Sequence, residues 1–189
     1  MKIRHLLAAL SIASIVFLTV SAPARAQEAT SKDAAAAIKS GFVEDLGELE
    51  KKFVALADAF PQDKYTWRPM EGVRSVSEVL MLAAFEGYSF IPNSFGAKPV
   101  ELGSREEMAK LRTLSDKAQV TEHLKKGFAH AKQQLGALDA GTLTGKRKVM
   151  GQDMSVVQIA DGIAGDLHEH LGQLIAYARM NHIVPPWSK

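Results

Sequence analysis

An unbroken helical pattern over residues 155–181 constrains this fold more than any other stretch of the sequence. At about 100° per residue, its apolar side chains fall on a single face. That apolar stripe consists of Val156, Ile159, Ala160, Ile163, Leu167, Leu174 and Ala178. His170 lies inside the stripe, and Asp166, one turn earlier, lies on its shoulder. The helix therefore needs partners that cover its apolar face, and it carries two ionisable groups to the edge of that face.

Three further segments show the same helical periodicity. They span residues 42–60, 75–91 and 116–138. Pro61 and Pro92 directly follow the first two segments, and both helices are predicted to stop there because proline lacks the amide hydrogen that continues a helix. Capping boxes at Ser75 and Ser104 mark helix starts, and the second opens a short helix. Residues 141–152 read as a loop or short hairpin. Four long helices without an alternating strand pattern predict an all-α fold, a four-helix bundle.

Residues 1–26 are typical of a secretory signal peptide. Lys2 and Arg4 give a positive start, residues 6–20 form an uncharged apolar run, and Ala24–Ala26 supplies the small residues that precede a cleavage site. The apolar run, of about 15 residues, is shorter than the roughly 20 that a membrane span needs. We therefore expect cleavage at the end of this segment, a periplasmic or secreted protein, and no stable membrane insertion afterwards.

The remainder divides into a lead-in at 27–37, predicted to be disordered because it lacks large apolar residues, and a single domain at 38–189. The leader holds three of the 23 basic residues and none of the 21 acidic residues, which leaves 20 basic against 21 acidic. This balance offers no basic surface for nucleic acid, which we do not expect as a partner. The chain has no cysteine, so disulfides and thiolate metal ligands are excluded.

Asp166 and His170 stand four residues apart, the spacing that places two side chains on one face of a helix. Glu86 is the single charge after the first turn of the strongly apolar segment 75–91, which is expected to be buried. One histidine and two carboxylates from facing helices suit a divalent ion such as Zn, Ni, Mn or Fe. Such an ion would support hydrolysis or group transfer on a small molecule. His168 and His170 diverge by about 160° and make a poor ligand pair.

The same residues also fit a purely structural interpretation. A buried histidine hydrogen-bonded to a carboxylate one turn away satisfies both groups without a metal ion. Glu86 would then accept a hydrogen bond from Tyr177 or Arg179, or reach solvent. The protein would in that case be a metal-free bundle that binds a small ligand or another protein.

Two blocks of sequence resemble the DinB-like (DinB/YfiT) proteins. The first block comprises Trp67–Pro69 and Val73–Leu80, and the second comprises His168–Gln173, Tyr177–Asn181 and Val184–Ser188. The resemblance spans residues 42–188, and its C-terminal block is the more specific of the two. It implies a four-helix bundle in up-down-down-up order, and family members frequently form homodimers. Some are thiol-dependent transferases or hydrolases.

The resemblance also implies a metal site of three histidines, one on the second helix and two on the last. His170 matches the final histidine of this set, whereas Asp166 and Leu82 occupy the other two positions. An aspartate can replace a histidine for a hard ion and leucine cannot ligate, so Glu86, one turn after Leu82, is the expected substitute. Gln173 matches the family as well, and with Tyr177 it is expected to support the site.

Overall fold

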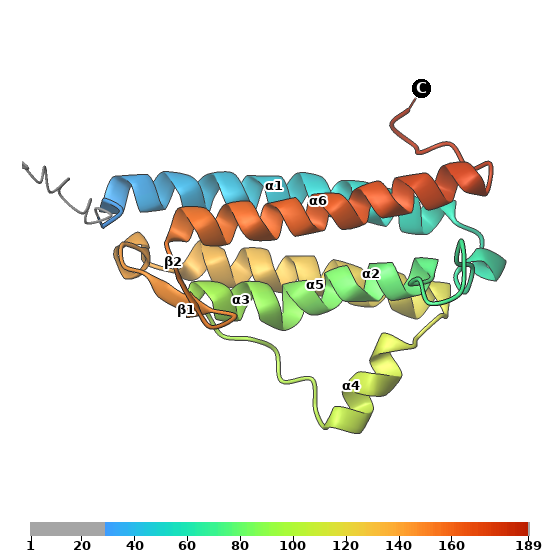
Figure 1. The fold of residues 1–189 in the computed structure, drawn as a ribbon, viewed down its shortest axis with the longest axis horizontal. Helices are drawn as coiled ribbons and strands as arrows, with labels where there is room; N and C mark the ends of the chain where they lie inside the picture. Colours follow the sequence, from blue (N-terminus) through green and yellow to red (C-terminus); the bar gives the residue numbers. More distant parts are fainter. Residues whose placement is uncertain (1–28, 189) are drawn as a thin grey trace, which may run out of the picture.

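The computed structural model describes residues 29–188 and has an all-α fold with one small β-hairpin (Figure 1). The predicted signal peptide lies outside the described residues. In chain order the elements are α1 (Lys32–Ala59), η1 (Gln62–Lys64), α2 (Val76–Phe85), η2 (Glu86–Phe90), α3 (Ile91–Phe95), α4 (Arg105–Arg112), α5 (Lys117–Ala137), η3 (Ala140–Leu143), β1 (Arg147–Val149), β2 (Gln152–Met154) and α6 (Val156–Met180). Between residues 29 and 188, no helix combines the length and apolar character needed to cross a membrane.

The long helices lie side by side in two pairs. Helices α1 and α6 run in one direction, and the α2–η2–α3 segment and α5 run in the opposite direction (Figure 1). Each pair packs on the other, because α1 contacts α5 and α2 contacts α6. The short helix α4 stands apart from this body and touches α2 (Figure 1).

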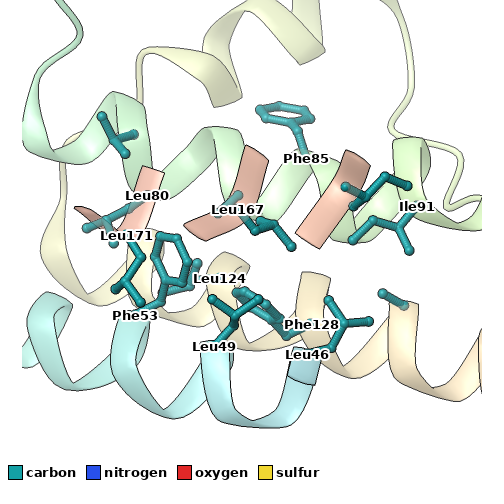
Figure 2. Close-up of a cluster of buried hydrophobic side chains, with 14 of the residues drawn as sticks. Leu46, Leu49, Phe53, Leu80, Phe85, Ile91, Leu124, Phe128, Leu167 and Leu171 are labelled. Atoms are coloured by element: carbon teal, nitrogen blue, oxygen red, sulfur yellow. The ribbon is translucent and has the colours of Figure 1, made fainter. Parts of the chain in front are cut away.

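The core fills the space between α1, the α2–η2–α3 segment, α5 and α6, and each of these contributes to it. Figure 2 labels Leu46, Leu49 and Phe53 of α1, Leu80 and Phe85 of α2, Ile91 of α3, Leu124 and Phe128 of α5, and Leu167 and Leu171 of α6. The rings of Phe53 and Phe128 join α1 to α5, with centroids 5.7 Å apart. The predicted stripe of α6 is confirmed, since all seven of its members are buried. Removing these apolar side chains from water contributes about 25 cal/mol per Å² of buried apolar surface, and this contribution holds the helices together.

Helix α1 begins at Lys32, so the predicted disordered lead-in is wrong for residues 32–37. The Ser31 hydroxyl caps the helix by accepting a hydrogen bond from the Ala34 amide at 3.2 Å. Alanine has the highest intrinsic helix propensity, and four consecutive alanines follow Asp33. Ala35 is fully buried in the core. A short side chain therefore packs where large apolar residues were expected to be necessary.

The second long helical segment continues past Pro92, so the predicted stop there is also wrong. Residues Glu86–Phe90 form a π-helical turn, and α3 carries the helix on to Phe95. Pro92 falls in the first turn of α3, where a missing amide hydrogen is tolerated. The segment ends at Gly96, whose φ of 74° is accessible to glycine without a steric penalty. The buried helix is thus continuous from α2 through the π-helical turn to the end of α3.

The segment before α6 contains the short hairpin that its sequence allowed. Strands β1 and β2 pair antiparallel, with Val149 opposite Gln152. The two-residue turn between them consists of Met150 and Gly151, with φ of 49° and 82°. Positive φ at both positions matches the right-handed twist of a tight hairpin. The hairpin contacts α3 through β1 and α6 through β2, beside the π-helical turn.

Candidate functional site

Three ionisable side chains converge where η2 faces α6. Glu86 opens the π-helical turn, and Asp166 and His170 lie one turn apart on α6. The His170 Nε2 atom is 3.6 Å from Asp166 Oδ2 and 3.8 Å from Glu86 Oε1. One potential ligand atom from each residue lies within 4.8 Å of the other two. The structure therefore brings together the three residues that the sequence singled out, from segments 80 residues apart in the chain.

Glu86 is the most enclosed member of this Glu86–Asp166–His170 cluster. The residue is 6% exposed, and its Oε2 atom is buried without a hydrogen-bond partner among residues 29–188. A carboxylate oxygen left unpaired in the interior is costly and requires a proton or a cation. Helix α2 is apolar on nearly every side, and Glu86 directly continues this helix into the core. The π-helical turn at this point is a feature that is frequent at functional sites.

The environment of Glu86 favours its neutral form when no cation is present. Burial, followed by the negative charge of Asp166, raises the pKa of Glu86 to about 9, while the positive charge of Arg74 opposes this shift. Asp166 is different, because half of its side chain is exposed. The side chain of His170 is 14% exposed and lies between the two. The cluster thus combines a buried acid, a half-exposed carboxylate and an imidazole that lies within 4 Å of both.

The cluster has the composition and spacing of a divalent-cation site. Imidazole nitrogen and carboxylate oxygen both bind Zn²⁺ at about 2.0–2.2 Å, so two ligands of one ion are at most about 4.4 Å apart. The separations of 3.6 and 3.8 Å from His170 to the two carboxylates lie below this limit, and all three potential ligand atoms lie within 4.8 Å of one another. A cation would also satisfy the unpaired Oε2 atom of Glu86. The three residues therefore fit a divalent ion, although they do not distinguish one metal from another.

An apolar cavity opens directly beside the two carboxylates. Its volume is about 420 Å³. It is lined by Glu86, Phe90, Val149, Met150, Met154, Ile159, Gly162, Ile163 and Asp166. The π-helical turn, the hairpin and the first half of α6 each supply part of this wall. No sequence pattern indicated this cavity, because the hairpin residues meet α6 and the π-helical turn only in the folded protein.

A second cavity, of about 460 Å³, is lined in part by Leu82 and Phe85 of α2. Its wall includes Arg68, Arg74 and Arg112, which the sequence interpretation did not select. Arg68 forms an ion pair with Glu78 at 3.2 Å, and the Arg112 guanidinium lies over the Phe85 ring. Two of the three arginines are therefore already engaged. Arg68 and Arg74 both belong to the first block of the DinB-like resemblance, which was the available signal in the sequence.

Gln173 and Tyr177 lie along α6 beyond His170, and their hydrogen bonds join them to each other. The Gln173 amide donates to the Tyr177 hydroxyl at 2.7 Å, and this hydroxyl donates to the Arg74 carbonyl at 3.0 Å. The Trp67 ring packs edge-on against Tyr177, with centroids 5.3 Å apart. The alternative in which Glu86 accepts from Tyr177 is therefore wrong. These two residues fix the loop that carries Arg74, whose charge acts on Glu86.

The remaining histidines of interest lie away from the cluster. His168 contacts Asp45 of α1 at 3.1 Å, in agreement with its predicted divergence from His170. His123 accepts or donates a hydrogen bond with the Tyr88 hydroxyl at 3.0 Å.

Comparisons of this chain with protein-family models, curated proteins and solved structures give no match. What the site can do therefore follows from its own residues.

Proposed function

We propose that this protein is a metal-dependent hydrolase or transferase that acts on a small molecule at the Glu86–Asp166–His170 cluster. The observation that carries the proposal is the convergence of three ligand groups around a buried carboxylate oxygen that has no hydrogen-bond partner among the described residues. A structural histidine–aspartate pair would satisfy its own members and would not require Glu86 to be buried beside them. A divalent ion accounts for all three groups at once.

The fold and location belong to the same proposal. We infer a DinB-like four-helix bundle in up-down-down-up order, supported by the directions of α1, the α2–η2–α3 segment, α5 and α6 (Figure 1). The signal-like residues 1–26 support export to the periplasm or the outside. Cellular thiol cofactors are scarce there, so hydrolysis fits better than thiol transfer. The homodimer implied by the resemblance is part of the proposal as well.

Each residue of the cluster has a distinct task in this function. His170 and Asp166 present their ligand atoms from one rigid helix, and Glu86 supplies the third from the facing element. A bound divalent ion polarises a substrate oxygen and lowers the pKa of water. Asp166 is half exposed, so the site is open to solvent on the side of this residue. Glu86 must lose its proton when it ligates, so cation binding at neutral pH is coupled to proton release.

A second candidate function is metal-free binding of a small ligand. The observation that favours it is the apolar cavity next to a carboxyl group that is neutral at pH 7. A ligand with an oxygen-rich end and an apolar body would bind there without a metal ion. The two functions differ in whether the purified protein holds a metal.

Metal analysis of untagged protein separates the two. We expect about one divalent ion per chain in the wild type, and loss of at least 10-fold in affinity in Asp166→Ala and in His170→Ala, because each substitution removes a direct ligand. His168→Ala is the matched control, since this histidine is on the same helix but faces Asp45; it should retain the ion. A wild-type protein without metal that regains none on dialysis against Zn²⁺ or Mn²⁺ would contradict the proposal.

Leu82→His should tighten metal binding further. Leu82 lies one turn before Glu86, as the hydrogen bond from the Glu86 amide to the Leu82 carbonyl shows. Side chains one turn apart share a helix face, so the new imidazole would reach the cluster as a fourth ligand. We expect an increase in Zn²⁺ affinity of about 10-fold, measured by competition with a chelating dye. Unchanged affinity would show that position 82 does not face the cluster.

A further inference from the structure

The apolar cavity beside the cluster has the properties of a binding site for one part of a substrate. We propose that it takes an unbranched acyl or alkyl chain of medium length, whose oxygen-bearing head lies at Glu86, Asp166 and His170. This inference depends on the proposed function for the head group, but the cavity is defined by its own residues. It narrows the substrate from a small molecule in general to an acyl derivative such as an ester or amide.

The walls of the cavity are polar at one end only. Of its nine lining residues, Glu86 and Asp166 are the sole ionisable ones, and both belong to the cluster. The other walls are aliphatic, aromatic or thioether side chains and one glycine, namely Phe90, Val149, Met150, Met154, Ile159, Gly162 and Ile163. Such walls offer no side-chain hydrogen bonds to a sugar, a nucleotide or a peptide. They stabilise an apolar chain by removing it from water.

The size of the cavity also fits a short chain and not a large ligand. At about 420 Å³ it lies near the lower end of the range for small-molecule sites, roughly 300–1,000 Å³. Its walls come from three separate elements, the π-helical turn, the hairpin and α6. Among the wall residues, Val149, Ile159 and Ile163 are themselves buried. The cavity is therefore held open by residues that are anchored in the core.

Gly162 and Met150 shape the cavity in opposite ways. A Cβ atom added at Gly162 would meet no atom of the described residues within 4 Å, so the glycine leaves space on the α6 side. Met150 stands at the tip of the hairpin, in a turn with positive φ, and is 85% exposed. Methionine side chains are flexible and polarisable, which suits a wall that adapts to chains of different length. An exposed methionine here is accounted for by contact with an apolar ligand.

Alkyl hydroxamates test this inference, because the hydroxamate head chelates a metal ion while the chain length is varied. We would titrate Zn²⁺-loaded protein with acetohydroxamate and octanohydroxamate by calorimetry. Each buried CH₂ group tightens binding roughly fourfold, so burial of only three or four of the CH₂ groups that octanohydroxamate adds should tighten binding on the order of 100-fold. Gly162→Leu should remove most of this difference by filling the cavity. Gly172→Leu is the matched control on α6, at a glycine that is equally open but lies outside the cavity.

The outcomes separate the cavity from the metal centre. Equal affinity for the two hydroxamates, or a chain-length effect that survives in Gly162→Leu, would overturn the inference. If acetohydroxamate does not bind at all, the proposed metal function fails, and the cavity is then tested in metal-free protein with octanoic acid against acetic acid. Binding of octanoic acid that Gly162→Leu abolishes supports the cavity, whereas absence of binding overturns it.

Discussion

Replacing Gly127 with alanine is expected to lower the free energy of unfolding by about 3 kcal/mol or more. Gly127 lies on α5 where this helix crosses the α2–η2 junction. A Cβ atom at this position would come within 2.5 Å of the Ala84 carbonyl oxygen and 3.0 Å of its Cα atom. Both are backbone atoms within a helix, so they cannot rotate away as a side chain would. The two helices would have to separate, with loss of packing along the core.

Gly136→Ala is the matched control for this substitution. Gly136 lies on the same helix, and within the described structure no atom would meet its Cβ within 4 Å. Alanine is a better helix former than glycine by about 1 kcal/mol, so this variant should be neutral or more stable. Urea denaturation followed by circular dichroism measures both. Similar stabilities for the two variants would show that the close approach at Gly127 is not a constraint on the fold.

The same crossing fixes the position of the site. Gly87 follows Glu86 directly, and its added Cβ would clash with the Gly127 backbone. Close contact between two glycines therefore sets how near η2 lies to α5. Because Glu86 begins η2, a shift of this turn would also move its carboxylate relative to α6. We accordingly expect Gly127→Ala to weaken metal binding in whatever fraction of the protein folds.

Glu86→Gln is expected to stabilise the metal-free protein at pH 8 by roughly 2 kcal/mol or more. The pKa of Glu86 is raised to about 9 in the folded state, whereas an exposed glutamate titrates near 4.5. The folded protein therefore binds more protons than the unfolded chain between these values, and its stability falls as pH rises through this range. Each unit of difference between the folded and unfolded pKa corresponds to about 1.36 kcal/mol of folding free energy, so even half of the shift would account for roughly 2 kcal/mol or more. Glutamine removes the titration.

Thermal or urea denaturation from pH 5 to pH 9, after treatment with a chelator, measures this effect. Wild-type stability should fall with pH, and the fall should be much smaller in Glu86→Gln. Glu169→Gln on the exposed side of α6 is the control and should retain the wild-type slope. Adding Zn²⁺ should stabilise the wild type at high pH and leave Glu86→Gln nearly unaffected. An unchanged slope in Glu86→Gln would mean that another buried group dominates the pH dependence.

Much of the local structure follows from the sequence alone. The capping boxes at Ser75 and Ser104 form as predicted, with reciprocal hydrogen bonds between each serine and the glutamate three residues later. These motifs act within a single turn and need no tertiary partner. The apolar stripe of α6 likewise predicted which face would be buried. The four-residue spacing placed Asp166 and His170 together for the same reason, since helix geometry fixes it.

Other features were decided by the tertiary structure. The helix passes Pro92 because a π-helical turn precedes it, and that turn lies where α5 approaches closely at Gly127. The cavity requires the hairpin to contact α6, and Tyr177 donates to Arg74 because the Trp67 loop packs on it. Sequence periodicity reports which face of a helix is apolar, but it contains no distance between segments far apart in the chain. The sequence thus determined the helices and the candidate ligands, and only packing between helices brought Glu86 to the other two.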